Sequence, residues 1–239
     1  MVRKGNLLII VPAYNEEETI EEVVRRSERY GDVCVVDDCS TDWTPQIIGR
    51  RNDIHVITHE RNTHIPGAVL DGMRYAAEKG YAFCVTMDAG LSHNPDEIPL
   101  FINHEYADVV IGSRKKKINT PQHRKVLSLT GNLLYNMSLD FPRSLFKKTY
   151  YKDLTSGFRR YSRKAMDLLL AEDLQSRSFD FLLESVVHIY RNNLIISEVP
   201  ITYKFSNSSL RSSVVKDCLQ ACARSMFNQT PKHGNEKHR

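Results

Sequence analysis

The stretch LLIIVPAYNEEETI, residues 7–20, is the clearest indication of the fold class. Five apolar residues in a row end at Pro12, which is typical of a buried β-strand, and a charged segment with apolar residues at helical spacing follows. The same order of apolar run, polar loop and helical pattern repeats up to residue 113. Alternating strands and helices form a mostly parallel sheet with helices on both faces, so we predict a Rossmann-like α/β fold.

The same patterns predict the boundaries of the elements. Apolar runs predict strands at residues 7–11, 33–36, 54–58, 82–87 and 108–111, and helical spacing predicts helices at 16–29, 44–50, 67–79 and 96–103. The alternation is lost after residue 113, where we predict helices at 124–137, 179–190 and 210–227 and strands at 156–161 and 194–203. No linker rich in Gly, Ser or Pro divides the chain. We therefore predict one domain over residues 1–227, with a divergent second half, and a polar tail over 228–239.

Composition places the 239-residue chain among globular proteins, with 41% hydrophobic and 26% charged residues. No apolar run is long enough to span a bilayer, and the first apolar stretch lacks a cleavage site, so we expect a cytoplasmic protein. The five cysteines are an odd number without metal-type spacing, and we expect them to be reduced.

The net charge of +4 is unevenly distributed, because residues 114–164 hold 14 Lys and Arg against 2 Asp and Glu. A basic segment of this size indicates an anionic partner. Nucleic acid, a diphosphate ligand and an anionic membrane surface are the three alternatives at this point.

Polar residues that carry chemistry cluster where the predicted strands end. The segment 12–16 follows the first strand, Asp37 and Asp38 follow the second, and Asp88 follows the fourth. Ligands of open parallel sheets bind at this edge. Helix capping accounts for Asn15 but leaves the doubled aspartates and Asp88 unexplained. The chain has neither a G-x-G-x-x-G nor a P-loop motif, which argues against dinucleotide dehydrogenases and P-loop phosphate transfer.

Six motifs in sequence order resemble those of one enzyme family. They are IIVPAYNEEETI (9–20), VVDDCSTD (35–42), MDAGLSHNPDEIP (87–99), IGSR (111–114), DLTSGFRRYSR (153–163) and EVPITY (198–203). With these motifs the chain resembles the family 2 glycosyltransferases of GT-A fold, and most of all their dolichyl-phosphate mannose synthase-like branch. The resemblance implies a nucleotide-sugar half at about residues 1–113 and an acceptor half at about residues 114–227.

The resemblance also implies a donor site with a divalent cation. The residues expected at the nucleotide are Pro12, Tyr14, Glu16, Val36, Asp37, Asp38, Asp88 and Ala89. One of the two aspartates after the second strand would accept a ring N–H of guanine or uracil. In the family, a D-x-D motif after the fourth strand holds a metal on the diphosphate. Here the motif reads Asp88-Ala89-Gly90, so Asp88 and Ser92 remain as the expected ligands of a weakly held Mg²⁺ or Mn²⁺.

Residues of the basic segment are implied on the acceptor side. Arg114 in IGSR and Arg124 in QHRK match family positions that contact phosphate, which suits the forked guanidinium group. Asp153 would orient a basic residue or the acceptor. The residues expected to contact the acceptor are Ser156, Gly157 and Phe158. We expect catalytic roles for Asp88, Arg114, Arg124 and Asp153, and a mobile loop between the two arginines.

The resulting prediction is an inverting glycosyltransferase. It would move a hexose, with mannose from GDP-mannose as the expected donor, to a polyprenyl or dolichyl phosphate, as a peripheral protein at the cytoplasmic membrane face. An acceptor phosphate is already ionised at neutral pH and needs no general base, so catalysis would consist of positioning and charge neutralisation.

Two alternatives stay open. One is a UDP-sugar-dependent transferase that acts on a glycan acceptor, for which Asp153 is the candidate general base. The other is a nucleotide-binding protein whose turnover is impaired because Gly90 interrupts the metal motif. We expect no nucleic-acid partner, because the acidic strand-end loops would repel a phosphate backbone.

Overall fold

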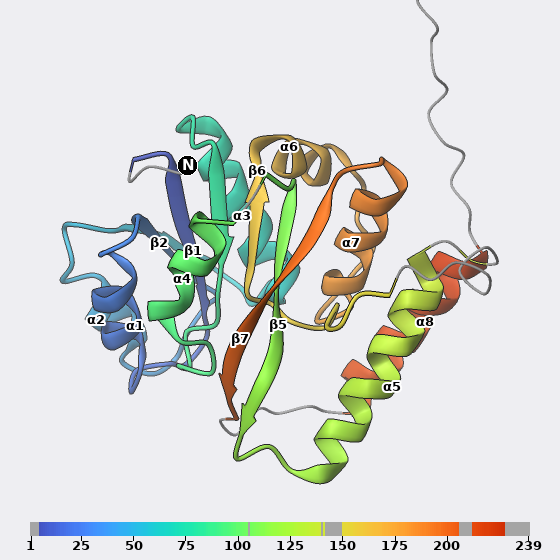
Figure 1. Cartoon of the computed structure of the whole chain (residues 1–239). Coiled ribbons are helices and arrows are strands. Elements are labelled where there is room, and N and C mark those ends of the chain that lie inside the picture. Colours follow the sequence, from blue (N-terminus) through green and yellow to red (C-terminus); the bar gives the residue numbers. More distant parts are fainter. Residues whose placement is uncertain (1–4, 105, 140, 142–149, 206–211, 228–239) are drawn as a thin grey trace, which may run out of the picture.

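The computed structural model describes residues 5–104, 106–139, 141, 150–205 and 212–227, with side chains except at 122–127 and 212–215. A seven-stranded sheet in the order β3-β2-β1-β4-β6-β5-β7 runs through its centre (Figure 1). The strands are β1 (Leu7–Ala13), β2 (Asp32–Asp37), β3 (His55–Thr58), β4 (Phe83–Thr86), β5 (Val109–Ile118), β6 (Arg159–Ser162) and β7 (Ile196–Lys204). β6 is antiparallel to β4 and β5, and the other pairings of these strands are parallel. The predicted mostly parallel α/β fold is confirmed.

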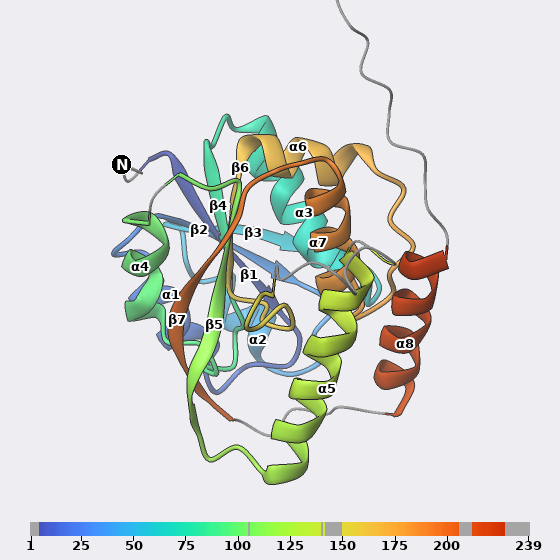
Figure 2. The ribbon, with the colours of Figure 1, turned by 45° about the vertical axis from the view of Figure 1, so that its right-hand side comes forward.

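Helices cover both faces of the sheet, as predicted. α1 (Ile20–Ser27), α2 (Thr44–Ile48) and α4 (Ile98–Ile102) lie on one face, and α3 (His64–Glu78), α6 (Arg163–Ala171) and α7 (Phe181–Arg191) lie on the other (Figure 1). A 3₁₀ turn, Pro95–Glu97, leads into α4. α5 (Gln122–Leu139) and α8 (Ser212–Phe227) pack against each other and against α7 (Figure 2). Within the described residues, no helix combines the length and the apolarity needed to cross a bilayer.

The alternation of side chains along β1 divides the core into two hydrophobic clusters. Leu8 and Ile10 belong to the cluster under α3, α6 and α7, whereas Leu7, Ile9 and Val11 belong to the cluster under α1 and α4. All five side chains are buried, because β1 is a central strand with helices above and below. The unbroken apolar run in the sequence therefore reflects burial on both faces of the sheet.

β6 contributes two consecutive buried arginines. Successive side chains of a strand point to opposite faces, so Arg159 and Arg160 enter opposite sides of the sheet. Arg159 donates from Nε to the Ser156 carbonyl and from Nη2 to the Leu154 carbonyl, both at 2.7 Å. Arg160 donates from Nη1 to the carbonyl of Phe101 in α4 at 2.6 Å. Through these two side chains, β6 is hydrogen-bonded to the loop before it on one face of the sheet and to α4 on the other.

The segment between Arg114 and Arg124, predicted to be a mobile loop, begins as strand β5 up to Ile118, and its mobility stays a prediction. β5 continues beyond its predicted end and pairs with β7 up to Ile118, which lies opposite Lys204. The lysines at the end of β5 are mostly solvent-exposed, so the pattern of a buried strand is missing there although the backbone pairing continues.

Two further boundaries differ from the prediction. The strand predicted at 156–161 is β6 and begins at Arg159, because the residues before it form the loop that the Arg159 side chain holds. α6 was not predicted, although Ser162 caps it by accepting a hydrogen bond from the Ala165 N–H at 3.2 Å. The predicted tail at 228–239 lies outside the described residues.

Replacement of Gly72 by alanine tests the packing of α3 on β1. A Cβ at this position would lie 2.5 Å from Cγ2 of Ile10, so we expect Gly72→Ala to lower the free energy of unfolding by about 1–3 kcal/mol. In α5, a Cβ at Gly131 would meet nothing closer than Thr155 Cγ2 at 3.9 Å, so Gly131→Ala should stabilise by up to about 1 kcal/mol. Urea unfolding of both variants measures the difference, and equal midpoints would contradict the packing described here.

Candidate active site

The loops after β1 and β2 meet at the carboxyl edge of the sheet and are joined by hydrogen bonds. The Asn15 N–H donates to Ser40 Oγ at 2.9 Å, and Asn15 Oδ1 accepts from the Thr41 N–H at 2.8 Å. Asn15 adopts φ +57°, a left-handed conformation that asparagine tolerates better than most residues. The Glu16 N–H donates to Thr44 Oγ1 at 2.9 Å. These bonds fix the backbone on which Tyr14 and Glu16 are carried.

The two adjacent aspartates at the end of β2 have different environments. Asp38 accepts hydrogen bonds from the N–H and Oγ1 of Thr63 and from the N–H of His64, at 2.7, 2.9 and 2.7 Å. Its Oδ1 also lies 2.8 Å from Nδ1 of His59. Asp38 therefore satisfies the amino end of α3, and the expectation that capping leaves it unexplained is wrong.

Asp37 keeps one carboxylate oxygen open. Its Oδ1 accepts from the Ser40 N–H at 3.2 Å, whereas its buried Oδ2 has no hydrogen-bond partner among the described residues. A buried carboxylate oxygen without a donor is costly, and such groups in a native fold call for an explanation. Of the two aspartates, Asp37 is thus the one whose carboxylate has an unsatisfied oxygen.

Asp88 lies directly after β4 with its side chain 50% exposed. Its N–H donates to Nδ1 of His93 at 3.3 Å, which requires that nitrogen to be unprotonated. Burial lowers the pKa of His93, and the nearby charge of Asp88 opposes this shift only in part, so the imidazole is neutral. A Cβ at Gly157 would lie 3.6 Å from Asp88 Oδ1, so the loop before β6 approaches Asp88 closely.

Gly90 lies against the carboxylate of Glu16. A Cβ at position 90 would be 3.3 Å from both Oε1 and Oε2 of Glu16. Burial raises the pKa of Glu16 above its ordinary value, a hydrogen bond from Thr19 Oγ1 opposes this, and the negative charge of Asp88 raises it further. The carboxylates of Glu16 and Asp88, from two different loops, are therefore close enough to influence each other.

Arg114 of β5 forms a two-pronged ion pair with Asp153. The Nε–Oδ2 and Nη2–Oδ1 distances are 2.6 and 2.7 Å, and the side chains are 15% and 6% exposed. The guanidinium carbon also lies 5.2 Å from the ring centre of Tyr203. Burial alone would raise the pKa of Asp153, but the hydrogen bonds and charge of Arg114 outweigh it, and this pKa lies below its ordinary value. Glu198 Oε1 accepts from the Asp153 N–H at 2.9 Å and supports the pair.

Several predicted site residues are buried. These are Val36, Ala89, Ser156 and Phe158, whereas Tyr14 is exposed and Pro12 and Gly157 are partly exposed. Phe158 packs between His93 and Phe101, with ring centres 5.1 and 4.3 Å away. Of the three predicted acceptor residues, Gly157 is the one that lies against Asp88.

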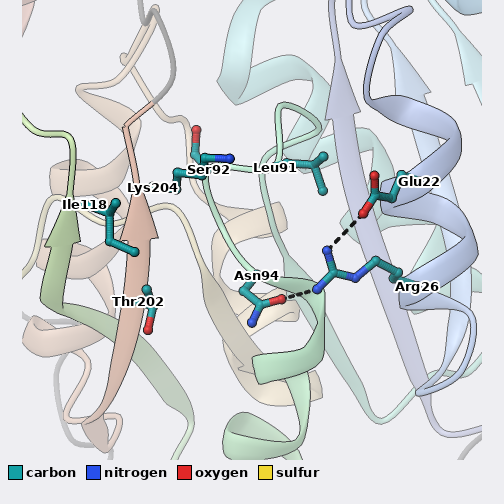
Figure 3. A pocket seen from close by; sticks show the side chains of 8 residues that line it. All are labelled: Glu22, Arg26, Leu91, Ser92, Asn94, Ile118, Thr202 and Lys204. Atoms are coloured by element: carbon teal, nitrogen blue, oxygen red, sulfur yellow. Dashed lines mark hydrogen bonds and ion pairs between the residues drawn. The ribbon is translucent and has the colours of Figure 1, made fainter.

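Ser92 and Arg124 are the remaining predicted site residues. Ser92 lines a cavity of about 370 Å³ between α1 and the ends of β5 and β7, and Asp88 is not among its described lining residues (Figure 3). Arg124 is in the first turn of α5, where side chains are not described. The structure thus groups Asp88 with Glu16 and Gly157, and Arg114 with Asp153, without placing Ser92 beside Asp88.

Three residues of the site were not predicted individually. His93 lies under Asp88, Glu198 fixes the backbone of Asp153, and Tyr203 stacks with Arg114. All three belong to the quoted motifs MDAGLSHNPDEIP and EVPITY. Their membership of these motifs is the sequence signal by which they could have been found. The partners of Glu198 and Tyr203 come from distant parts of the chain, so these two roles could not be inferred from local spacing, whereas His93 and Asp88 are only five residues apart.

The residues present fit a divalent cation that is shared with a diphosphate. Among the described residues, no three His, Cys, Asp or Glu side chains are grouped to hold a metal ion by themselves. Magnesium and similar hard cations are commonly held by one or two carboxylates, with substrate phosphates and waters completing the shell. The half-exposed carboxylate of Asp88 is suitable as one such ligand.

Comparison with known proteins identifies the family. The sequence profile described as "Glycosyl transferase family 2" matches residues 8–170. An undecaprenyl-phosphate mannosyltransferase of Micrococcus luteus is 31% identical over 209 residues, which cover 82% of this chain and 83% of that protein. A UDP-N-acetylglucosamine–dolichyl-phosphate N-acetylglucosaminyltransferase of Methanococcus voltae is 31% identical over 225 residues, which cover 85% and 88%.

A solved structure shares the fold. Glucosyl-3-phosphoglycerate synthase from Mycobacterium tuberculosis, in complex with Mn²⁺, UDP and glucosyl-3-phosphoglycerate, superposes with a TM-score of 0.67 at 16% sequence identity. The superposition covers 95% of this chain and 81% of that chain. The chain belongs to the family 2 glycosyltransferases, and the enzyme class and GT-A fold implied by its motifs are confirmed.

Replacement of Asp153 by asparagine tests the ion pair with Arg114. Asp153→Asn leaves a largely buried guanidinium unpaired, so we expect the free energy of unfolding to fall by about 3 kcal/mol at neutral pH. In the exposed pair of Arg163 and Asp167, the control Asp167→Asn should change it by less than about 0.5 kcal/mol.

The cost of Asp153→Asn should also depend on pH. Because the pKa of Asp153 is lowered in the folded state, its stabilisation is complete above the unfolded pKa near about 4 and is lost as pH falls through the folded pKa. Urea unfolding of wild type and variant between about pH 7 and pH 3 should therefore show the difference shrinking with acidification. A constant difference would contradict the role given to the ionised carboxylate.

Proposed function

We propose that the chain transfers a hexose from a nucleoside diphosphate sugar to a polyprenyl phosphate, with GDP-mannose as donor and dolichyl phosphate among the acceptors. The state of Asp153 is the observation that carries the proposal. Its carboxylate is held by Arg114 through both oxygens, and its pKa is lowered. A carboxylate in that state is a poor general base, which favours an acceptor that is already ionised.

The open oxygen of Asp37 supports a nucleotide base at the end of β2. Guanine and uracil each carry a ring N–H that can donate to Asp37 Oδ2, which lacks a donor among the described residues. The exposed ring of Tyr14 lies on the loop after β1, which is hydrogen-bonded to the loop after β2. The name of the Micrococcus luteus relative, an undecaprenyl-phosphate mannosyltransferase, supports mannose as the transferred sugar, whereas the name of the Methanococcus voltae relative makes a UDP-sugar the second candidate donor.

The transfer step follows from an ionised acceptor. A phosphate oxygen of the acceptor forms a bond to the anomeric carbon while the bond from that carbon to the nucleoside diphosphate breaks, so the configuration is inverted in one displacement. No proton has to be removed, and the protein aligns two anions and neutralises their charge. Arg114 and Arg124 are the proposed phosphate contacts. A bound Mg²⁺ or Mn²⁺ beside Asp88 would neutralise charge on the departing diphosphate.

An exposed apolar stripe supports peripheral contact with a membrane. Leu129 and Leu133 are one turn apart on α5 and are 66% and 52% exposed. They lie within the basic segment 114–164, and apolar side chains among positive charges are typical of helices that rest on anionic lipid. We propose that this surface brings the site to a lipid-borne acceptor at the cytoplasmic membrane face.

A transfer assay tests the proposal. Purified protein is mixed with vesicles that contain polyprenyl phosphate, and GDP-mannose, UDP-glucose and UDP-N-acetylglucosamine are supplied separately with Mn²⁺. We expect a mannosyl phosphoryl lipid of inverted configuration from GDP-mannose, and salt-sensitive sedimentation of the protein with anionic vesicles. If product forms only from a UDP-sugar, that UDP-sugar and not GDP-mannose is the donor. Transfer to a free glycan in the absence of lipid would refute the proposed acceptor.

Paired substitutions separate Asp37 from Asp38. We expect Asp37→Asn to weaken binding of the nucleoside diphosphate about 10- to 100-fold, because a charge-assisted hydrogen bond to the base is lost. Its free energy of unfolding should not fall, because no donor to Oδ2 is lost. Asp38→Asn should lower the free energy of unfolding by about 2 kcal/mol through its four donors around α3. Calorimetric titration and urea unfolding measure both, and equal effects at the two positions would contradict the assignment.

A further inference from the structure

The cation that the donor site would hold requires more oxygen ligands than Asp88 provides. The following inference rests on the proposed function, because it concerns a cation on the donor diphosphate. In the sequence, the second carboxylate of the metal motif is missing, since position 90 is glycine. In the structure, the place next to Gly90 is occupied by the carboxylate of Glu16, which comes from the loop after β1.

We propose that Glu16 is the second carboxylate ligand of the divalent cation and replaces the side chain that Gly90 lacks. A Cβ at position 90 would lie 3.3 Å from each Glu16 carboxylate oxygen, so that carboxylate lies at the start of the path an aspartate side chain would take. The pair of Glu16 and Asp88 gives the cation two carboxylates, which is the usual number for Mg²⁺ when diphosphate oxygens and waters complete the shell.

The position of Glu16 is fixed by its surroundings. Its N–H donates to Thr44 Oγ1, and its carbonyl accepts from the N–H groups of Thr19 and Ile20 at the start of α1. Its carboxylate Oε2 accepts from Thr19 Oγ1 at 3.1 Å, while no described hydrogen bond engages Oε1. One oxygen thus orients the group and the other is available to a cation, which is the division of roles expected for an oriented metal ligand.

The glycine at position 90 follows from the same geometry. An aspartate at position 90 would place a further negative charge next to Glu16, in addition to that of Asp88. Like charges at such distances destabilise each other. This chain carries its second carboxylate on the loop after β1. The cation would then join the loops after β1 and β4, so metal binding and nucleotide binding by the loop after β1 are coupled.

A transposition of the carboxylate tests the inference. Four variants are compared with wild type: Glu16→Gln, Gly90→Asp, the double variant with both changes, and the control Glu18→Gln, which changes an exposed glutamate two residues away. Binding of Mn²⁺ is measured by the loss of the free-ion electron paramagnetic resonance signal, with saturating GDP and, separately, UDP. Urea unfolding of each variant shows that it is folded.

The expected pattern has three parts. Glu16→Gln weakens Mn²⁺ binding by about tenfold or more, as for loss of a metal ligand or its support, whereas Glu18→Gln leaves it unchanged. Gly90→Asp alone gives no comparable gain. The double variant recovers most of the affinity, because the carboxylate now stands at position 90 without a charged neighbour at position 16.

Other outcomes overturn the inference. Unchanged Mn²⁺ binding in Glu16→Gln would show that Glu16 is not a ligand. Nucleotide affinity that falls equally with and without Mn²⁺, and is not recovered by the double variant, would place Glu16 at the sugar or base instead. Nucleotide binding by wild type that is independent of Mn²⁺ would also refute the metal role, while transfer in the vesicle assay would leave the proposed function intact. Failure of wild type to bind GDP or UDP would refute the proposed function itself.

Discussion

The antiparallel pairing of β6 with β4 and β5 is the contact on which the rest of the structure depends. Asp88 lies two residues beyond the end of β4 and β5 carries Arg114, so the spacing of these two groups is set by the strand that lies between β4 and β5. The residues just before β6 form the loop with Asp153 and Gly157, and Arg159 holds this loop through two backbone carbonyls. One strand of four residues therefore places Arg114, its partner Asp153 and the loop that approaches Asp88 relative to one another.

The charged groups of the site are held in place by contacts within the chain. Arg114 is neutralised by Asp153 and supported by Tyr203, whereas Asp37 and Glu16 each retain a carboxylate oxygen without a described donor. Fixed charges and dipoles of this kind cost no reorganisation when a diphosphate binds or departs. The division also separates the functions of the two halves, since carboxylates gather at the parallel strands and basic groups at β5 and the helix after it.

The sequence was sufficient for those parts of the fold in which local pattern and burial agree. The strands β1, β2 and β4 are apolar runs that end at site residues, and they lie close to their predicted positions. Asp37 and Asp38 could not be distinguished, because the donors that engage Asp38 lie more than twenty residues away. The partner of Arg114 is 39 residues distant, and the exposed lysines of β5 conceal a paired strand. Sequence pattern reports on exposure and local propensity, whereas these features depend on tertiary contact.

The position of β6 also has a consequence for the order in which the chain can fold during synthesis. β5 precedes β6 in the sequence but lies beyond it in the sheet, so it has no neighbour on the β4 side until residue 162 has left the ribosome. A nascent chain that ends near residue 150 exposes the edge of β4 and the apolar side chains of β5. Such an intermediate presents the unpaired edges that chaperones protect; insertion of β6 joins β4 to β5, and β7 completes the sheet afterwards.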